Sequence, residues 1–247
     1  MTRPRLRDAI ASPSGKQPYV NRLFARIADR YDLITVLLSY GLDRRWKRRL
    51  VRMAAVLAGD RAIDLACGTG DLTYAIAIAG AERATGLDIT APMLAIARAK
   101  QRAPQVPRVT FVRGDMMALP YRDASATLVT AGYGLRNVPD TAGALREVFR
   151  VLAPGGRFFS LDFGHPRRPL FDRLYLTYLT IVGSTLGLVL HGDPDTYRYI
   201  PASLALYPPQ PEIAALMTRI GFIDTGWQNL IGGMMAIHYW RKPARGW

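Results

Sequence analysis

The chain has 247 residues, of which 49% are hydrophobic and 21% charged, a balance that suits a folded domain and excludes a largely disordered protein. Its single cysteine, Cys67, excludes an internal disulfide and fits a reducing compartment. The net charge is +14, and residues 1–60 hold 13 Lys or Arg against 5 Asp or Glu. This surplus favours an anionic partner such as membrane headgroups, nucleic acid or an acidic metabolite, although a solvated basic surface explains it equally well.

The N-terminal segment is basic and rich in Pro, Ser and Gly, and the apolar run of a secretory signal does not follow it. We therefore predict a disordered basic arm over residues 1–18 and expect the protein in the cytoplasm. In residues 21–56, apolar side chains recur at helical spacing, with an interruption at Gly41. Residues 19–247 are predicted to form a single domain, whose residues 19–58 make a helical cap.

The middle of the chain alternates short apolar runs with amphipathic stretches. Helices are predicted at residues 72–79, 92–103, 142–151 and 212–220. Strands are predicted at residues 61–65, 84–87, 109–112, 126–131 and 157–162, followed by antiparallel strands at 225–230 and 234–241. This order predicts an α/β, Rossmann-like fold with a seven-stranded, mostly parallel sheet and helices on both faces.

Residues 164–208 break this alternation and are predicted to form an insertion over the ligand site. They include the longest apolar stretch, residues 174–190, which is a little short for a membrane span and is diluted by Thr, Ser and Gly. We interpret this stretch as a buried helix, or as a helix that covers the ligand.

Ligands of such sheets bind outside the carboxyl ends of the strands, where this chain places glycines and carboxylates. In the turn ACGTGD, which follows Asp64, glycines allow the backbone to approach a ligand closely. Asp88 ends the second strand and can accept hydrogen bonds from both ribose hydroxyls, although it can also cap the next helix. Asp115 and Met116 follow the third strand and can contact an adenine ring, unless they form a solvent-facing turn.

The acidity of this turn distinguishes between two cofactors. A dinucleotide fingerprint ends in Gly or Ala, where this chain has Thr73, and Asp64 and Asp71 disfavour a pyrophosphate. S-adenosylmethionine is cationic at its sulfonium and amino groups, so carboxylates suit it better. The sequence therefore predicts an S-adenosylmethionine site, formed by Asp64, Ala66, Gly68, Gly70, Asp88, Ile89, Met93, Asp115, Met116 and Gly132.

Six segments carry motifs of a known family. They are RYDLITVLLSYGLDRRWKR (30–48), DLACGTGDL (64–72), YGLRNVPD (133–140), RVLAPGGRFFSLDF (150–163), YRYIPASLALYP (197–208) and GGMMAIHYW (232–240). Together they resemble the menaquinone and ubiquinone biosynthesis C-methyltransferases of the UbiE type, over about residues 20–240. The chain departs from the family pattern at Ile34-Thr35, where Met-Asn is usual, at Asp43, where His is usual, and at residues 162–164, where Asp-Phe-Gly replaces Glu-Phe-Ser.

The resemblance implies a class I methyltransferase that transfers a methyl group from S-adenosylmethionine to a ring carbon of a prenylated quinol, most simply demethylmenaquinol. A relative that methylates the carbon or oxygen of another aromatic or isoprenoid metabolite is the alternative. A nucleic-acid methyltransferase would explain the charge, but GYGL at residues 132–135 replaces the Asn/Asp-Pro-Pro-aromatic motif of base-amine methylation. No nucleic-acid partner is therefore expected. A non-catalytic scaffold that binds the cofactor is a further alternative.

An aromatic C–H is a poor nucleophile, so such an enzyme must activate the quinol by removing a hydroxyl proton and must stabilise the resulting phenolate. Arg136 and Asn137 follow the fourth strand, where the acceptor is expected. Arg136 is predicted to stabilise the phenolate or to polarise a water that takes the proton, unless it is a structural arginine that pairs with Asp140 or Glu147. Arginine stays protonated, so it is not itself the base.

Other polar residues complete the predicted acceptor site. Asp43 is a candidate for orienting a water, or pairs with Arg45 or Lys47. Three tyrosines are predicted to contact the acceptor, namely Tyr31, Tyr133 and Tyr197. Weaker candidates for the base are His165, His191 and His238. The sequence shows no spacing of a metal site. The basic first helix and arm predict a peripheral contact with anionic lipid at the inner membrane face, and a homodimer is left open.

Overall fold

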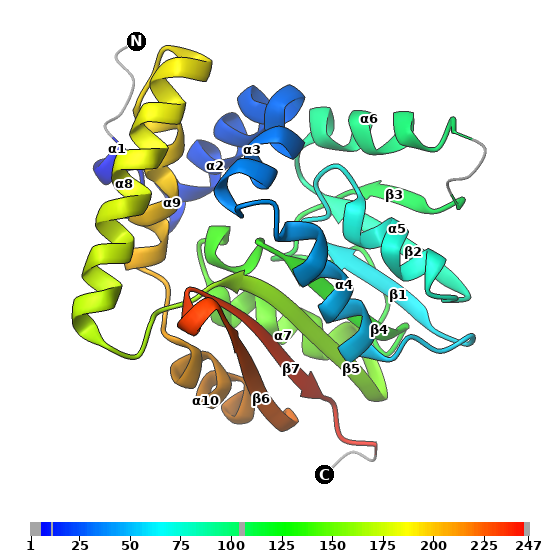
Figure 1. Ribbon diagram of the computed structural model, residues 1–247. Helices are drawn as coiled ribbons and strands as arrows, with labels where there is room; N and C mark the ends of the chain where they lie inside the picture. The colour runs from blue at the N-terminus through cyan, green and yellow to red at the C-terminus, as the bar shows by residue number, and fades with distance from the viewer. Residues whose placement is uncertain (1–5, 11, 104–106, 245–247) are drawn as a thin grey trace.

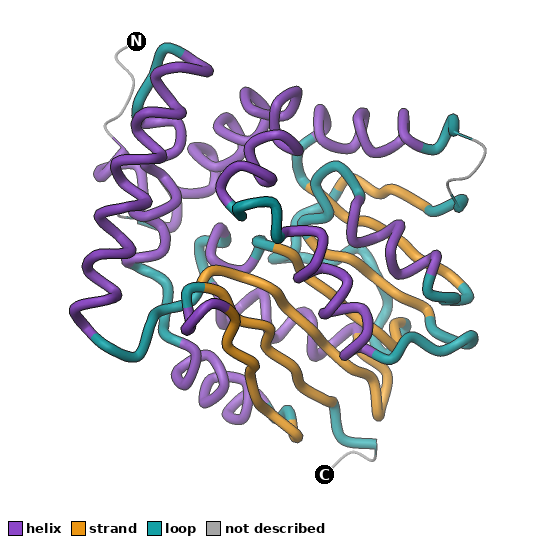
Figure 2. The backbone as a smooth tube through the Cα atoms, in the orientation of Figure 1, coloured by secondary structure: helices purple, strands orange, loops and turns teal. Residues whose placement is uncertain are grey.

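The computed structural model describes residues 6–10, 12–103 and 107–244, and these form a seven-stranded sheet between two layers of helices (Figures 1 and 2). The strand order is β3-β2-β1-β4-β5-β7-β6, with β1 to β5 parallel and β7 antiparallel to both of its neighbours. The predicted fold class is therefore confirmed. The strands are β1 (Arg61–Leu65), β2 (Arg83–Asp88), β3 (Thr110–Arg113), β4 (Ala126–Gly132), β5 (Leu152–Phe163), β6 (Ile223–Leu230) and β7 (Met235–Arg241).

Successive strand residues supply the two faces of the core, because side chains alternate along a strand. Val129 of β4 and Phe158 of β5 belong to a buried cluster with the helices α7 and α10. Their neighbours Leu128 and Phe159 belong to a second cluster with α4 and α5. The helices of the sheet layers are α4 (Asp43–Ala54), α5 (Asp71–Ile78), α6 (Ala91–Lys100), α7 (Thr141–Val151) and α10 (Gln210–Ile220).

Two helical segments lie beside the sheet, at the end where the parallel strands finish (Figure 1). The first contains α1 (Leu6–Ile10), α2 (Pro13–Ile27), the short 3₁₀ helix η1 (Ala28–Arg30) and α3 (Tyr31–Leu38). The second lies within the predicted insertion and contains α8 (Pro169–His191) and α9 (Asp195–Ala205). They share a third buried cluster, in which Ile27 and Ile34 pack with Tyr197 and Tyr199.

The prediction of a disordered arm over residues 1–18 is wrong for residues 6–10 and 12–18, while residues 1–5 and 11 lie outside the described part. The helix α2 begins here because Ser12 caps it, accepting a hydrogen bond from the Gly15 N–H at 3.2 Å, and because Pro13 suits the first turn. Ile10 of α1 is buried in the third cluster. Lys16 donates hydrogen bonds of 2.8 Å to the carbonyl oxygens of Arg136 and Val138, which ties α2 to the loop after β4.

Of the two interpretations of the 174–190 stretch, the buried helix is wrong, whereas the helix that covers a ligand agrees with Tyr175 and Leu179, which line a cavity beside the sheet. By length and composition α8 could cross a membrane, because an 18-residue window has a mean hydropathy of 1.5, yet only 22% of that window is buried. Only one side of α8 packs onto the protein, and its buried residues are Tyr175, Leu179, Gly183 and Gly187.

Candidate active site

A first cavity, here called the strand-end cavity, lies at the carboxyl ends of β1, β2, β3 and β4. It encloses about 630 Å³ of space, partly open to solvent, which is a usual size for a small-molecule site. Eight of the ten residues predicted to bind the cofactor line it. They are Ala66, Gly68, Asp88, Ile89, Met93, Asp115, Met116 and Gly132. These residues lie together because parallel strands end at one edge of the sheet.

The backbone at this edge adopts conformations that side-chain-bearing residues avoid. Ala66, after β1, has φ +49°, and Tyr133, after β4, has φ +60°. Such conformations cost on the order of 1–3 kcal/mol each and concentrate at functional sites. Gly68 has φ +55°, and a Cβ there would contact only the Tyr31 ring, at 3.6 Å. The strand-to-helix turn therefore leaves open space above its backbone for a ligand.

The carboxylates of the cavity are held by backbone amides. Asp88 accepts hydrogen bonds from the N–H groups of Gly68 and Thr90, at 2.8 and 2.7 Å, and burial raises its pKa. Asp115 accepts one from the Met117 N–H at 2.9 Å. Each carboxylate oxygen has two lone pairs, so both side chains keep acceptor capacity for a ligand. These acceptors suit the hydroxyls and amine of an adenosine, which donate hydrogen bonds.

Two of the predicted cofactor residues lie elsewhere. Asp64 is buried and accepts hydrogen bonds from the hydroxyls of Thr73 and Thr130, at 2.7 and 2.8 Å, and burial raises its pKa to about 6. Gly70 is the N-cap of α5, and a Cβ there would lie 2.8 Å from the ring of Phe111. The structure thus places Gly70 in a packing role, and Asp64 at an adjoining recess.

This recess, here called the acidic recess, is lined by Asp64 and Asp71. It also contains two polar residues that the sequence analysis did not assign to the cofactor, Lys47 and Thr69. The Lys47 ammonium lies 2.8 Å from Asp43 and 3.4 Å from Asp71. Burial opposes its charge, but the two carboxylates outweigh burial and raise the pKa of Lys47. The Thr69 hydroxyl donates a hydrogen bond of 2.6 Å to Asp32. A recess with charges of both signs suits a zwitterion.

The helix α2 forms the outer wall of the strand-end cavity with Gln17, Val20, Asn21 and Phe24. Sequence reasoning missed all four, since residue 17 was assigned to a disordered arm and the other three to a part of the helical cap for which no ligand contact was predicted. Helical spacing was the available signal, because the side chains at positions 17, 20, 21 and 24 share one face of a helix.

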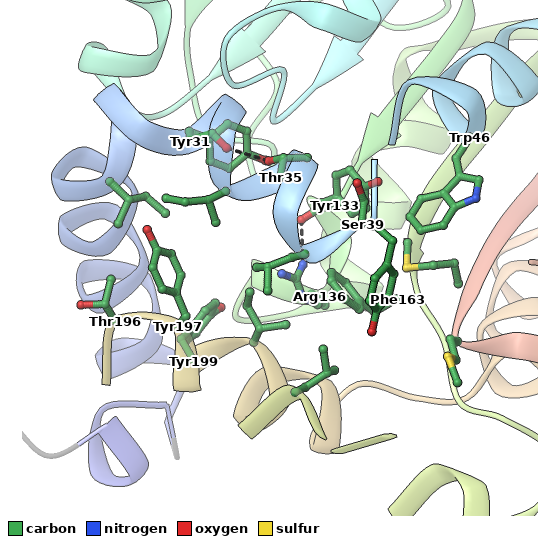
Figure 3. A pocket seen from close by; sticks show the side chains of 18 of the residues that line it. Tyr31, Thr35, Ser39, Trp46, Tyr133, Arg136, Phe163, Thr196, Tyr197 and Tyr199 are labelled. Atoms are coloured by element: carbon green, nitrogen blue, oxygen red, sulfur yellow. Dashed lines mark hydrogen bonds between the residues drawn. The ribbon is translucent and has the colours of Figure 1, made fainter. Parts of the chain in front are cut away.

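A second cavity of about 860 Å³, here called the apolar cavity, lies between the sheet edge and the two helical segments (Figure 3). Tyr31, Tyr133 and Tyr197 all line it, as expected of acceptor contacts. Tyr31 and Tyr133 also line the strand-end cavity, as does Phe24, so two tyrosine rings and a phenylalanine ring lie between the cavities. The apolar lining comprises Leu23, Phe24, Ile27, Ile34, Leu38, Trp46, Phe163, Leu179, Ile200, Ile231, Met234 and Met235.

Arg136 is the one charged side chain among the described residues that line the apolar cavity. It is only 4% exposed, lies 3.3 Å from the Asp162 carboxylate, and stacks 4.7 Å from the centre of the Phe163 ring. Its Nε has no hydrogen-bond partner among the described residues. The alternative prediction paired Arg136 with Asp140 or Glu147. That pairing is wrong, because Asp140 lies near Arg146 and Glu147 pairs with Arg150.

Asn137 and Asp43 both contact Tyr133. The Asn137 amide donates to the Tyr133 carbonyl at 2.8 Å, and its oxygen accepts from the Tyr199 hydroxyl at 3.0 Å. The Tyr133 hydroxyl donates to Asp43 at 2.7 Å, and burial together with this carboxylate raises the pKa of Tyr133 well above its ordinary value. Of the two partners predicted for Asp43, the structure places Lys47 in contact with it.

The three histidines lie outside the linings of both cavities. His238 is buried with its ring parallel to that of Trp240, and burial lowers its pKa to about 4. His165 contacts Asp172 at 3.1 Å, and His191 lies 2.8 Å from the Tyr197 hydroxyl. These positions disfavour a histidine base. Within the described ranges, no cluster of three or more His, Cys, Asp or Glu could hold a metal ion.

Comparisons with known proteins agree with this geometry. The sequence model of the ubiE/COQ5 methyltransferase family matches residues 13–242. The chain belongs to this family. It is 41% identical to the demethylmenaquinone methyltransferase of Thermus thermophilus, over 90% of this chain and all of that one. It is 37% identical to the ubiquinone/menaquinone biosynthesis C-methyltransferase UbiE of a Marinomonas species, over 89% of this chain and 88% of that one.

Solved structures resemble its fold. A SAM-dependent methyltransferase from Thermotoga maritima has a TM-score of 0.65 and 18% identity, covering 90% of this chain and 99% of that one. Phosphoethanolamine N-methyltransferase 2 of Haemonchus contortus, solved with S-adenosyl-L-methionine, has a TM-score of 0.61 and 15% identity, covering 81% of this chain and 52% of that one. The family and the fold together make this chain an S-adenosylmethionine-dependent methyltransferase.

Proposed function

We propose that this enzyme methylates a ring carbon of a prenylated quinol, most simply converting demethylmenaquinol to menaquinol. The observation that carries the proposal is the apolar cavity, whose lining holds one buried arginine and which is separated from the strand-end cavity by two tyrosine rings and a phenylalanine ring. An apolar acceptor with one polar end suits such a cavity. The activities for which the relatives are named support the same acceptor class.

The strand-end cavity and the acidic recess suit S-adenosylmethionine, which supplies an electrophilic methyl group when bound. We assign the ribose hydroxyls to Asp88 and the adenine to Asp115, Met93 and Met116, which line one cavity. The open backbone above Gly68 provides room beside them. The methionine end of the cofactor is a zwitterion, so its carboxylate is assigned to Lys47 in the recess.

Arg136 is proposed to stabilise the phenolate of the acceptor. We propose that a water takes a quinol hydroxyl proton, which places negative charge on the oxygen and raises electron density at the adjacent ring carbon, the nucleophile. The ring carbon that gains the methyl group then loses its own proton to solvent, and the oxygen regains a proton. A buried guanidinium attracts that oxygen more strongly than an exposed one would, because water does not screen it. Asp162 and the Phe163 ring hold the guanidinium in place. Its Nε has no partner among the described residues and is proposed as the donor to the acceptor oxygen.

Tyr133 is proposed to receive the hydroxyl hydrogen bond of the quinol. Because its own O–H donates to Asp43, its oxygen is left as an acceptor, and a quinol hydroxyl is a donor. Asp43 acts through Tyr133 and is a positioning residue, and Asn137 holds the same turn through the Tyr133 carbonyl. Tyr31 and Tyr197 are proposed to contact the ring and the first part of the tail. We propose cytoplasmic activity at the inner membrane face, where a prenylated quinol resides.

The experiment that tests this function measures methyl transfer from labelled S-adenosylmethionine to reduced demethylmenaquinol, alongside a panel of soluble phenols. Product formed at the quinol ring carbon supports the proposal. Turnover confined to another phenol would assign the chain to a different aromatic acceptor, and binding of S-adenosylmethionine without any acceptor-dependent turnover would indicate a scaffold.

A further inference from the structure

The helix α8 differs from a usual surface helix, which buries its apolar side and exposes its polar side. Its buried side contains two glycines, whereas its exposed side is apolar. A Cβ on Gly183 would lie 2.9 Å from the Tyr197 carbonyl oxygen of α9, and one on Gly187 would lie 2.6 Å from the Asp193 carbonyl oxygen, so α9 and the loop before it approach the α8 backbone closely. The exposed side presents Leu170, Phe171, Leu174, Tyr178, Ile181 and Leu188.

The helix α3 extends this surface. Leu33, Val36, Leu37 and Tyr40, on α3 and just after it, are also exposed, with exposed fractions from 40% to 58%. The rings of Tyr40 and Tyr178 stack with their centres 6.1 Å apart, which joins the two helices. These four residues and the six of α8 form a surface that we call the α3–α8 face. A surface of this kind on a folded monomer marks an interaction site.

The α3–α8 face adjoins the apolar cavity. Ile34, Leu38 and Tyr40 from the α3 side line that cavity, and so do Tyr175 and Leu179 of α8. The same two helices therefore present apolar side chains both to the cavity and to the outside. A long apolar molecule that enters between them would remain in contact with apolar side chains throughout.

Arginines border this face. Arg167 and Arg168 precede α8 and are exposed, as is Arg173 in its first turns. Arg44 and Arg45, also exposed, begin α4 just after Tyr40. Two copies of the chain placed face to face would bring like charges together at this border, whereas anionic lipid headgroups would pair with them. The charge thus favours a lipid surface over a second copy.

We propose that the α3–α8 face docks onto an anionic phospholipid surface, with α8 lying in the plane of the interface. Helices of this kind bury an apolar side at the headgroup boundary while basic residues contact the phosphates. Spanning the membrane would remove α8 from α9 and from the loop before it, whose backbone lies close to Gly183 and Gly187. This docking would admit a lipid-dissolved quinol to the apolar cavity, and in that respect the proposal rests on the proposed function.

The test is flotation of the full chain with vesicles of phosphatidylcholine, alone or mixed with phosphatidylglycerol. The variant Leu174→Gln/Ile181→Gln changes two exposed residues outside both cavities, so it is expected to fold normally. Its matched control is Leu57→Gln/Ile78→Gln, which changes two exposed apolar residues elsewhere. We expect the wild type and the control to partition onto the mixed vesicles, and the α8 variant to partition about tenfold or more weakly.

A second pair of variants tests the charge. Arg167→Gln/Arg168→Gln is expected to weaken binding to the mixed vesicles by roughly thirtyfold, because two arginines near an anionic surface contribute about 1 kcal/mol each and about 1.4 kcal/mol corresponds to tenfold. Arg83→Gln/Arg102→Gln, which changes exposed arginines on the sheet side, should leave binding unchanged. Equal partitioning of the α8 variant and the wild type would overturn the proposal. So would a wild-type dimer that Leu174→Gln/Ile181→Gln dissociates, without vesicle binding by either protein.

Activity separates this proposal from the proposed function. The α8 variant should keep wild-type turnover on a short-chain, soluble demethylmenaquinol and lose turnover only on quinol embedded in vesicles. Failure of every demethylmenaquinol as a substrate would contradict the proposed function, while the vesicle partitioning would still stand. Equal turnover of both proteins on embedded quinol would contradict the docking surface alone.

Discussion

The strand-end cavity and the apolar cavity share two tyrosines, but they are built from different parts of the chain. The first is formed mainly by residues that directly follow strands, where the sheet backbone determines their positions. The second is formed mainly by α2, α3, α8 and α9, which pack on one another beside the sheet. Donor binding thus depends on a rigid edge, and acceptor recognition depends on helices that can vary without altering the sheet.

The largest expected effect separates the two cavities at Arg136. Arg136→Ala should lower turnover about 10²- to 10³-fold, as expected when a buried group that stabilises developing charge is removed. Affinity for S-adenosylmethionine should change little, since Arg136 lines the apolar cavity. Turnover measured with labelled cofactor and calorimetric binding report the two properties. Arg146→Ala, an exposed arginine on α7, is the control. Near-normal turnover of a folded Arg136→Ala protein would remove this residue from the mechanism.

The converse effect is expected at Asp88. Asp88→Ala removes the proposed ribose acceptor and leaves the N–H groups of Gly68 and Thr90 without their partner, so affinity for S-adenosylmethionine should fall about 100-fold. Calorimetric titration measures the loss, and Asp123→Ala on an exposed loop is the control. At saturating cofactor the variant should recover most of its turnover. An unchanged dissociation constant would contradict the assignment of the ribose.

His238 tests whether the sheet core behaves independently of both cavities. Burial lowers the pKa of His238 from an ordinary 6.5 to about 4. The unfolded chain therefore binds a proton at this histidine more readily than the folded chain does. The free energy of unfolding consequently falls as the pH drops from 6.5 towards 4. The contribution of His238 to that loss should be about 2 kcal/mol at pH 4.5. In urea unfolding at pH 7 and 4.5, His238→Gln should therefore lose less stability than the wild type. Equal losses in the two proteins would show that His238 does not titrate in this way.

The smallest expected effect concerns Lys47 in the acidic recess. Lys47→Met should weaken the binding of S-adenosylhomocysteine about tenfold, because a charge-assisted contact to the carboxylate is lost. Binding of methylthioadenosine, which lacks both the carboxylate and the amino group, should be unchanged. Arg48→Met, its exposed neighbour on α4, is the control. Equal weakening for both ligands would assign Lys47 a structural role, through its ion pairs with Asp43 and Asp71.

The sequence by itself determined the sheet and most of the strand-end cavity. Parallel strands end at one edge, so the residues after each strand, such as Gly68, Asp88 and Asp115, meet there whatever the rest of the fold does. The predicted limits of the strands were less accurate, since the fifth strand was predicted to begin at residue 157, whereas β5 begins at Leu152. The sequence Ser12-Pro13 is also typical of a helix start, but we predicted disorder there because the segment is rich in Pro, Ser and Gly.

Only the tertiary structure decided which partner each polar group has and which side of each helix is covered. Arg136 pairs with Asp162, which no local spacing connects to it, and Lys16 reaches the loop after β4 from the first long helix. In α8 the apolar residues surround the helix, so their periodicity could not show which side packs. Close approach of α9 to Gly183, and of the loop before α9 to Gly187, decided it, because a glycine admits a neighbouring backbone, and Leu170, Leu174 and Leu188 were left facing outward.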